Sequence, residues 1–438
     1  MRHLGDITKI DGSKIPIVDC ICGGSPCQDL SVAGKRAGLD GERSGLFMEQ
    51  IRIFKEIREH DRRTNKRSDG SIRPRFLVWE NVPGALSSGK PKGEDFRIVL
   101  EEIARIADSD AVIPRPSDQW ANAGVIVGNG WSIAWRIHDA QFWGTAQRRK
   151  RIAVVADFGS ESAAEILFVK KGVSRDFNSC KKTRERTSAD IGGSIKKTSY
   201  TLKIRGGVER DSNGNKAGKG PLIQEEKAGT LGVSQDQTVF TFRYSLKNTY
   251  KADVAATLDL HSGSPNCNQG GMVVVYGESS FGGYNNDFAT LRAGGENYGG
   301  GSESLIIKEN GCVRRLTPTE CERLQGFPDG WTNIGSWTDT KGKLHKESSD
   351  TARYKALGNS IAVGYANHQS GFWMWLMKRI SERYDRPATL GSLFDGIGGF
   401  PLAWEFYNGK GSAIWASEIE EFPIAVTKYH FPEGSEIE

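Results

Sequence analysis

Apolar and polar positions follow two different periodicities in the first 158 residues. Short apolar runs rich in β-branched and aromatic residues predict four buried strands, at residues 15–22, 75–79, 131–137 and 151–157. Apolar positions at helical spacing predict helices over residues 46–58 and 96–106. Strands that alternate with helices at this spacing favour a parallel sheet flanked by helices.

The pattern changes after about residue 160, where Gly, Ser, Asn and Asp become frequent and the helical periodicity ends. Three Thr-Leu dipeptides, at 230–231, 257–258 and 290–291, are each followed by an apolar triplet. This pattern predicts short strands joined by loops, and hence a second domain that is mainly β or irregular. Chance recurrence in a glycine-rich segment explains the repeat almost as well.

Helical pattern returns near residue 312. Thr317 is a candidate N-cap, with Pro318 at the first helical position and Glu320 in the first turn. An apolar helix is expected over 361–380, and strands at 389–394 and 413–418 resume an α/β pattern. We therefore divide the chain into four segments: 1–158, 159–311, 312–386 and 387–438.

Composition narrows the class of protein without fixing a function. The chain has 438 residues, of which 37% are hydrophobic and 26% charged, with a formal net charge of +5. The N-terminus lacks a signal-peptide pattern and no apolar run is long enough to span a bilayer, so we expect a cytoplasmic protein. The small positive charge is compatible with a polyanionic partner but does not require one.

The cysteines raise the question of a metal site. Cys20, Cys22 and Cys27 lie close together among seven cysteines. However, Cys20 and Cys22 belong to an apolar run, where they would share one face of a buried strand. A paired His or a second Cys-x-x-Cys is absent nearby, so we expect no metal and reduced thiols.

Two candidate chemical groups directly follow predicted strands. Cys27 comes after the first strand and a Gly-Gly turn, and Lys35 and Arg36 could stabilise its thiolate, although a structural cysteine is the commoner case. Glu80 directly follows the second strand. Ligands bind at the carboxyl ends of parallel strands, where partial burial would raise the pKa of a carboxyl group into an acid–base range. A turn or N-cap glutamate is the plainer alternative.

Basic and glycine-rich segments add further candidates. Arg149 and Arg151 lie in the run 147–151 before a predicted strand, and guanidinium groups suit phosphate and base-edge recognition. The glycine turn 396–399 follows the strand at 389–394, and Glu418 is the last residue of the next strand, where it could hold ribose hydroxyls. The complete G-x-G-x-x-G spacing is missing, so the pattern indicates a nucleotide-linked cofactor but not NAD specifically.

Six segments together resemble the DNA (cytosine-5)-methyltransferase family: GGSPCQDLSVAGKRAGL, FLVWENVPG, QRRKRIAVVADF, RLTPTECERLQGFPDGW, KALGNSIAV and SLFDGIGGFPLAWE. The resemblance covers nearly all of 1–158 and 312–438. It implies a Rossmann-like S-adenosylmethionine-dependent methyltransferase sheet with helices on both faces. Residues 159–311 would then form a smaller, mainly β or irregular target-recognition domain.

The resemblance also implies a mechanism. Cys27 would attack C6 of a cytosine flipped out of double-stranded DNA, and Glu80 would hold N3 of the ring. Arg149 and Arg151 would brace the flipped base and its neighbours. The methyl group of S-adenosyl-L-methionine would pass to C5, and no metal is needed.

The remaining site residues follow from the same resemblance. The residues expected to bind the cofactor are Phe394, Asp395, Gly396, Gly398, Gly399, Glu418, Asp6, Asn359 and Ser360. The residues expected to contact DNA are Gln28, Ser31, Lys35, Arg36 and Thr290. Ile419 stands where many members carry an aromatic residue that packs on adenine, so this contact is expected to be weaker here.

The order of the segments departs from the family, because SLFDGIGG follows KALGNS instead of preceding every other block. The chain therefore resembles a circularly permuted enzyme, in which SEIE at 435–438 would read on into HLGDI at 3–7. Residues 387–438 must then fold back to complete the sheet, within a monomer or by exchange between chains. A bacterial or phage-encoded enzyme is expected, with a cognate restriction endonuclease as a partner in a restriction-modification role.

Three other functions remain open at this level. An RNA cytosine-5 methyltransferase of the same architecture is the nearest, although the long segment 160–311 favours duplex recognition. A catalytically inactive DNA-binding protein is disfavoured by the intact Cys27, Glu80, Arg149 and Arg151. A dinucleotide-dependent oxidoreductase is disfavoured by the incomplete glycine fingerprint.

Overall fold

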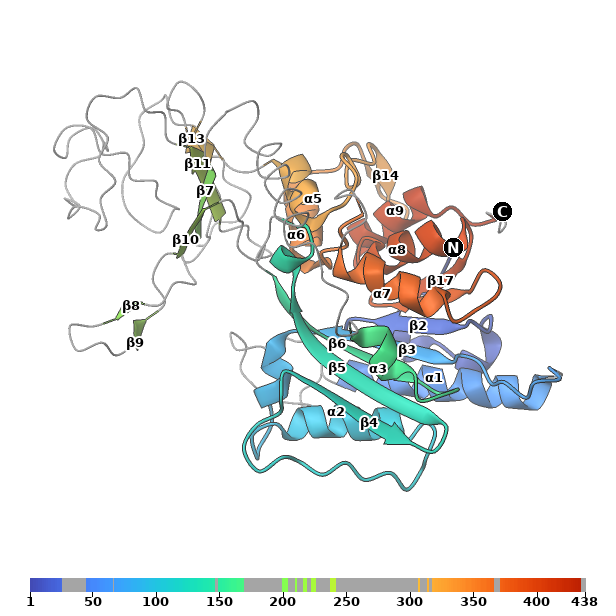
Figure 1. The fold of residues 1–438 in the computed structure, drawn as a ribbon. Coiled ribbons are helices and arrows are strands. Elements are labelled where there is room, and N and C mark those ends of the chain that lie inside the picture. Colours follow the sequence, from blue (N-terminus) through green and yellow to red (C-terminus); the bar gives the residue numbers. More distant parts are fainter. Residues whose placement is uncertain are drawn as a thin grey trace.

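The computed structural model describes residues 1–25, 45–65, 67–145, 149–168, 317–365 and 371–434, together with the backbone of seven short strands between residues 199 and 314. Eight strands form the main sheet, in the order β1-β17-β16-β2-β3-β6-β5-β4 (Figure 1). Their bounds are β1 Arg2–His3, β2 Cys20–Gly23, β3 Phe76–Asn81, β4 Ala123–Gly128, β5 Trp131–Asp139, β6 Lys150–Asp157, β16 Leu390–Leu393 and β17 Ala413–Ser417.

Strand direction divides the sheet into two parts. The strands β1, β17, β16, β2 and β3 are mutually parallel, whereas β6 pairs antiparallel with β3, and β5 antiparallel with β6. The prediction of a parallel sheet was therefore wrong for residues 151–157, because β6 runs antiparallel to both of its neighbours, whereas β5 runs in the same direction as β3. The reason is the short β5–β6 connection, which is too short for the helical crossover that parallel neighbours need. The edge strand β4 was not predicted.

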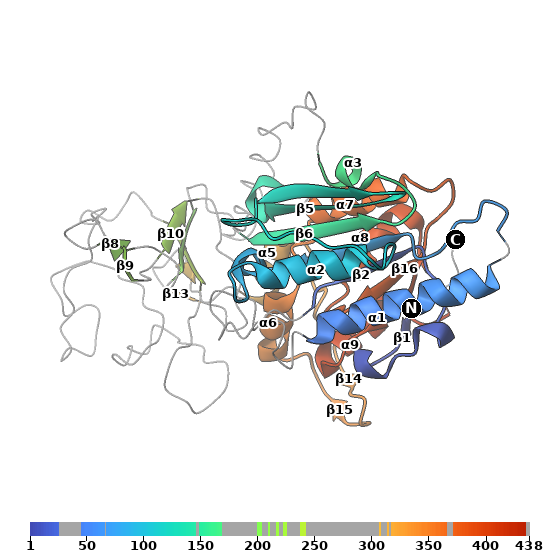
Figure 2. The ribbon, with the colours of Figure 1, turned by 90° about the horizontal axis from the view of Figure 1, so that it is seen from below.

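Helices cover both faces of the sheet (Figures 1 and 2). One face packs against α1 (Gly45–Thr64) and α2 (Glu94–Ala104), and the other against α7 (Phe372–Ser381), α8 (Gly399–Asn408) and α9 (Glu421–His430). Because α8 joins β16 to β17 on one face and α1 joins β2 to β3 on the other, a topological switch point lies between β16 and β2. The fold class is a Rossmann-like, doubly wound sheet with helices on both faces, as predicted.

The two faces also explain the first two cysteines. Cys20 and Cys22 are both fully buried on the face that α7 and α8 cover, with their sulfur atoms 3.9 Å apart. Ile21 points to the opposite face, against α1 and Leu77. The prediction that these cysteines share one face of a buried strand is confirmed.

The α5–α7 region contains one confirmed and one incorrect prediction. Thr317 and Glu320 form a reciprocal capping box at the start of α5 (Pro318–Gln325), as expected. The helix expected over 361–380 begins only at Phe372, after the non-helical residues 361–365. Gly364 has φ +74°, and a Cβ there would lie 2.3 Å from the Cα of Gly371, so this close backbone approach excludes a helix. The helix α6 (Asp350–Asn359) precedes it.

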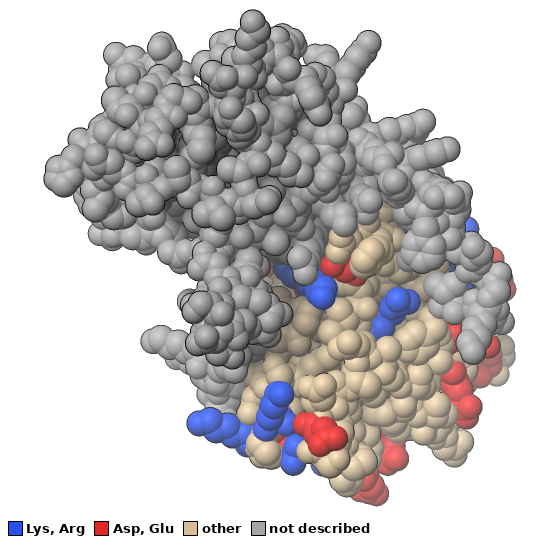
Figure 3. All heavy atoms as spheres, turned by 60° about the vertical axis from the view of Figure 1, so that its left-hand side comes forward, with Lys and Arg blue, Asp and Glu red and all other residues tan. Residues whose placement is uncertain are grey.

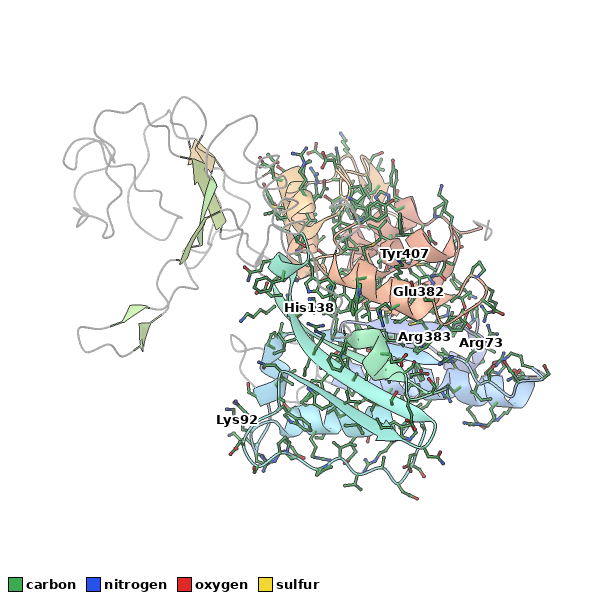
Figure 4. All side chains as sticks on the ribbon, viewed as in Figure 1. Arg73, Lys92, His138, Glu382, Arg383 and Tyr407 are labelled. Atoms are coloured by element: carbon green, nitrogen blue, oxygen red, sulfur yellow. The ribbon has the colours of Figure 1, made fainter. Side chains whose placement is uncertain are left out.

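Some smaller elements pack against this framework. They are α3 (Ala163–Leu167) and the hairpin β14 (Trp337–Thr338) and β15 (Leu344–His345). Figure 4 shows His138, near the end of β5, directed toward α7, where its ring stacks on Phe372 at 3.7 Å. Within the described residues, no helix has the length and apolar character needed to span a bilayer.

A second sheet forms between residues 199 and 314, with the order β10-β7-β11-β12-β13. Its strands are β7 Ser199–Lys203, β10 Leu222–Glu225, β11 Gln237–Thr241, β12 Ile306–Ile307 and β13 Val313–Arg314, and β8 (Glu209–Arg210) pairs separately with β9 (Lys216–Gly218). Two of the apolar triplets that follow the Thr-Leu dipeptides, at 238–240 and 305–307, contribute to the neighbouring strands β11 and β12, in which Val239 pairs with Ile306. All three Thr-Leu dipeptides lie outside the described residues.

The C-terminal segment folds back onto the N-terminal residues of the same chain. Strand β17 lies between β1 and β16, and the backbone N–H of Leu4 donates to the carbonyl of Ala416 at 2.8 Å. The amino group of Met1 donates to the carbonyls of Phe431 and Pro432 at 3.2 and 3.0 Å. Residues 387–434 therefore complete the sheet within one chain.

Candidate active site

The predicted site residues that the structure describes gather at one edge of the sheet. The five parallel strands end there, and β6 begins there. The residues at this carboxyl edge are Asp6 after β1, Glu418 after β17, Phe394 to Gly399 after β16, Gly24 and Ser25 after β2, Glu80 in β3, and Arg149 and Arg151 at the start of β6. Cys27, Gln28, Ser31, Lys35, Arg36 and Thr290 lie outside the described residues.

Glu80 forms an ion pair with Arg151. The guanidinium Nε lies 2.8 Å from Oε1 of Glu80, and the two side chains are only 15% and 13% exposed. The other carboxylate oxygen faces the turn after β2, because a Cβ on Gly24 would lie 3.0 Å from it. Glu80 is thus fixed beside the backbone that leads to Cys27.

Two strand β3 side chains hold the same turn. The indole Nε1 of Trp79 donates to Ser25 Oγ at 2.9 Å, and Asn81 Nδ2 donates to the Ser25 carbonyl at 3.4 Å. Trp79 and Ser25 are both buried. The position at which the chain leaves β2 toward Cys27 is therefore set by β3.

Arg149 makes different contacts from Arg151. Its side chain is 3% exposed, and Nη2 donates to the carbonyl of Ser360 at 2.6 Å and to that of Gly358 at 3.4 Å. Arg151, two residues later, contacts Glu80 instead. The two arginines thus connect different parts of the edge.

The turn after β16 has a backbone conformation that would let a ligand approach it closely. Phe394 has φ +55°, and Gly396 and Gly398 have φ +57° and +80°. A left-handed conformation is strained for a residue with a Cβ, and such strain is concentrated at functional sites. The Gly396 N–H donates to Glu418 Oε2 at 2.8 Å, which connects this turn to the end of β17.

Asp395 is the most unusual carboxyl group of the turn. One of its oxygens accepts from Ser392 Oγ, and the other is buried without a partner among the described residues. Burial, with a further contribution from the charge of Glu418, raises the pKa of Asp395 to about 7. Buried polar atoms are normally hydrogen-bonded, so an unpaired one at a strand end is a feature of ligand sites.

The other expected cofactor residues surround this turn. Glu418 accepts from the backbone N–H groups of Ile419 and Glu420, and Asp6 accepts from the backbone N–H and the hydroxyl group of Thr8. Ser360 is buried, whereas Asn359 is exposed and Ile419 is 67% exposed. Carboxylates with remaining acceptor capacity beside a glycine turn fit a nucleoside cofactor. Within the described residues, no cluster of His, Cys, Asp and Glu could hold a metal ion.

Gln50 is a site residue that sequence reasoning missed. It lies on α1 with no exposed surface, and neither amide atom has a hydrogen-bond partner among the described residues. Its Oε1 lies 2.5 Å from where a Cβ on Gly23 would be, at the end of β2. A polar residue within the apolar stripe of a helix was the signal that could have revealed it.

The described surface carries charge of both signs. Lys and Arg side chains lie near Asp and Glu side chains on the face shown in Figure 3. An extended field of one sign, which would indicate a nucleic-acid partner on its own, is not visible over the described atoms of this view. The charge of this face therefore does not by itself indicate a DNA partner.

A doubly wound sheet, a glycine turn after one strand and an acidic residue after the next define a Rossmann-like domain of the kind that binds nucleoside cofactors. The sequence profile described as C-5 cytosine-specific DNA methylase matches residues 2–106 and 126–369. The chain therefore belongs to the C-5 cytosine-specific DNA methylase family, whose members depend on S-adenosylmethionine.

Two curated relatives and one solved structure illustrate the similarity. The DNA N-6-adenine-methyltransferase of Escherichia phage P1 is 30% identical over 83% of this chain and 54% of its own length. The type II methyltransferase M1.ScrFI of Lactococcus lactis subsp. cremoris is 27% identical over 82% of this chain and 63% of its own. The chain thus spans between about half and two thirds of these relatives. The Dnmt2 methyltransferase of S. pombe has 12% identity and a TM-score of 0.39, over 87% of this chain and 84% of that one.

Proposed function

We propose that the protein transfers a methyl group from S-adenosylmethionine to C5 of cytosine within a specific sequence of double-stranded DNA. The observation that carries this proposal is Glu80, which Arg151 holds at 2.8 Å beside the turn that leads to Cys27. Membership of the cytosine-specific family supports the same reaction.

The proposed chemistry uses a thiolate and a carboxyl group on one flipped base. Cys27 adds to C6 of the ring, while Glu80 donates to or shares a proton with N3, so that electron density develops at C5. Arg151 keeps Glu80 oriented toward the base. Loss of the C5 proton after methylation re-forms the double bond and expels the thiolate. Extrusion of the base costs a few kcal/mol, which contacts outside the stack offset.

The cofactor supplies an electrophilic methyl group on a sulfonium centre. Glu418 and Asp6 would accept hydrogen bonds from its ribose and adenine groups. The backbone of Phe394, Gly396, Gly398 and Gly399 would approach it closely because three of these positions lack a Cβ, and Asp395, Asn359 and Ser360 would complete the pocket. Its binding at the switch point between β16 and β2 would place it beside the turn that leads to Cys27.

A methyl-transfer assay tests the proposal directly. The purified chain is incubated with labelled S-adenosylmethionine and duplex DNA, and the product is digested to nucleosides and identified by mass spectrometry. We expect 5-methylcytosine, and none with Cys27→Ser. Label in N6-methyladenine, or undiminished 5-methylcytosine with Cys27→Ser, would overturn the proposal.

Adenine methylation is a second candidate only because one relative, from phage P1, is named as an N-6-adenine enzyme. Direct methylation of an exocyclic amine needs no covalent nucleophile, so it would leave Cys27 and the Glu80–Arg151 pair without a role. An RNA substrate is the other candidate. Transfer to tRNA in place of duplex DNA, in parallel reactions, would support it.

We also propose that the segment order is circularly permuted. The family profile stops at residue 369, whereas residues 387–434, which resemble the first block of the family, supply β16 and β17 in the middle of the sheet. A variant opened between Asp385 and Arg386, with residues 434 and 1 joined by a short linker, should therefore fold and methylate. An unfolded product would contradict the permuted order.

The remaining expectations extend the same proposal. Residues 159–311 would form the target-recognition domain, with Gln28, Ser31, Lys35, Arg36 and Thr290 on the DNA, and 312–386 would complete the catalytic domain. We propose a monomer, since β16 and β17 join the sheet of their own chain. A restriction endonuclease of the same specificity is the partner proposed for a bacterial or phage-encoded enzyme in the cytoplasm, and an endonuclease protection assay tests it.

A further inference from the structure

We propose that Arg149 is a positioning residue for cofactor binding, which fixes the segment 357–361 against the catalytic half of the protein. The inference rests on the proposed function, which assigns the cofactor pocket to the carboxyl edge of the sheet. It separates Arg149 from Arg151: the first acts on the cofactor side and the second on the base side.

Arg149 is itself held rigidly. Its backbone N–H donates to Asp139 Oδ1 at 3.0 Å, and its carbonyl accepts from the Ala140 N–H at 3.0 Å. Its side chain is 3% exposed. The short connection between β5 and β6 therefore sets the direction in which the guanidinium points.

The partners of Arg149 are carbonyls at the end of a helix. The helix α6 ends at Asn359, and Nη2 of Arg149 donates to the carbonyls of Gly358 and Ser360. The last carbonyls of a helix lack intrahelical partners and carry partial negative charge, so a buried cation there is favourable. A single guanidinium nitrogen, Nη2, reaches both carbonyls, and the delocalised, weakly hydrated charge of an arginine suits a buried position better than the compact, strongly hydrated charge of a lysine.

The same segment touches the glycine turn of the proposed cofactor pocket. Gln325 Nε2 donates to the Leu357 carbonyl at 2.8 Å, which holds the segment from α5. Ile361 packs so closely on Gly399 that a Cβ there would lie 2.6 Å from Ile361 Cγ1. Contacts therefore run from Arg149 through 358–361 to the turn that follows β16.

This geometry predicts that Arg149 and Arg151 affect different steps of the reaction. Loss of the Arg149 contacts would release the 358–360 carbonyls and loosen the pocket before any DNA is bound. Loss of the Arg151 contact would free Glu80 but leave the pocket in place. Arg149 should therefore affect cofactor affinity in the absence of DNA, and Arg151 should affect the methylation step.

The test is the dissociation constant for S-adenosylmethionine without DNA, measured by calorimetry on the full chain. We expect Arg149→Met to weaken binding about tenfold or more and Arg149→Lys to weaken it less, because the lysine keeps one donor. Arg151→Lys should leave this constant within about twofold and lower kcat instead.

Arg58→Lys is a control for general destabilisation. Arg58 is also buried and also donates to two backbone carbonyls, of Ile72 and Pro74, but at the opposite edge of the sheet. Arg58→Lys should lower Tm by a similar amount to Arg149→Lys and leave cofactor binding unchanged. Thermal unfolding of each variant establishes that the binding data refer to folded protein.

Two results would overturn the inference. One is parental cofactor affinity in folded Arg149→Met together with reduced kcat, which would place Arg149 on the base. The other is equal weakening by Arg58→Lys and Arg149→Lys, which would make the effect one of stability. A failure of the proposed function is distinguishable, because the chain would then bind S-adenosylmethionine but form no 5-methylcytosine, or would not bind it at all.

Discussion

Buried aspartates at the two edges of the main sheet differ in their hydrogen-bond partners. At the amino edge, Asp19 precedes β2 and Asp157 ends β6, opposite Phe76 at the start of β3. Asp19 accepts from Arg386 at 2.7 and 2.9 Å and from Thr389, while Asp157 accepts from Arg75 at 2.8 and 3.0 Å and from Ser160 and Ser162. Arg73, labelled in Figure 4, lies 3.6 Å from Asp19.

The pKa values of these buried carboxyl groups depend on their hydrogen-bond and charge partners. Burial alone would raise the pKa values of Asp19 and Asp157, but hydrogen bonds and charges from their arginines more than offset burial and lower both. At the carboxyl edge, Asp395 has only a serine hydroxyl, and its pKa rises to about 7. The amino edge is therefore built for stability, and the carboxyl edge keeps unmet hydrogen-bonding capacity for ligands.

Glu80→Gln gives the largest expected effect, because it removes the proposed acid at the carboxyl edge while it keeps the shape of the side chain. We expect kcat for methyl transfer to fall about a thousandfold, with about 1–3 kcal/mol lost in the free energy of unfolding because Arg151 loses its charged partner. Glu59→Gln is the control, because it removes the charge of a half-exposed glutamate on α1 that also pairs with arginines. A large loss of stability with near-parental kcat would make Glu80 structural and break the comparison.

Asp19→Ala tests the amino edge. It leaves Arg386 and the Thr389 N–H without their buried acceptor, so the free energy of unfolding at pH 7 should fall by about 3 kcal/mol. Urea denaturation measures it, and Asp69→Ala, at an exposed aspartate, should change it by under about 1 kcal/mol. Cofactor affinity of the folded variant should stay at the parental value. Equal losses at both positions would refute the special role of Asp19.

Asp395→Asn sharpens the comparison through pH. The pKa of Asp395 is raised on folding, so the native state binds more protons than the unfolded state between about pH 4 and pH 7. The stabilisation from this proton therefore decreases as pH rises through that window, and the parent should lose stability relative to the variant by up to about 1.4 kcal/mol per pH unit. Urea titrations from pH 4 to 8 measure the difference. Parallel curves for parent and variant would exclude a raised pKa.

A pair of buried glutamines gives the smallest expected effect. Gln50 has no partner among the described residues, whereas Gln325 donates to Leu357. Gln50→Leu should therefore raise the free energy of unfolding by about 1 kcal/mol, and Gln325→Leu should lower it by about the same amount. Thermal or urea unfolding checks both. Destabilisation by Gln50→Leu would show that its amide is already satisfied.

Sequence periodicity was sufficient for most elements around the site. The strands containing Phe76 and Leu390 were predicted to within two residues. The strand predicted at 15–22 begins only at Cys20, and the helix predicted over 46–58 continues to Thr64, although both lie at the expected place because buried apolar runs and helical stripes reflect local geometry. Strand direction in β6 was not predictable from periodicity, since it depends on the connection and not on the strand. The late start of α7 depends on the Gly364–Gly371 approach, which is a tertiary contact.

The site was predicted as a set of residue types rather than as a set of contacts. The sequence motifs identified Glu80, Arg149 and Arg151, and the strand ends indicated that they converge. That Arg151 contacts Glu80 while Arg149 turns to residues 358 and 360 depends on partners up to 211 positions away. The pKa of Asp395 likewise depends on burial by other segments.

Covalent capture is the most direct test of the central claim that the carboxyl edge methylates cytosine through Cys27. The protein is incubated with S-adenosylmethionine and duplex DNA that carries 5-fluorocytosine at the methylated position, which cannot lose a proton from C5. Peptide mass spectrometry should then find one DNA adduct per chain, on Cys27, and none with Cys27→Ser. Methyl transfer to unmodified DNA without such an adduct, or an adduct on another residue, would contradict the account.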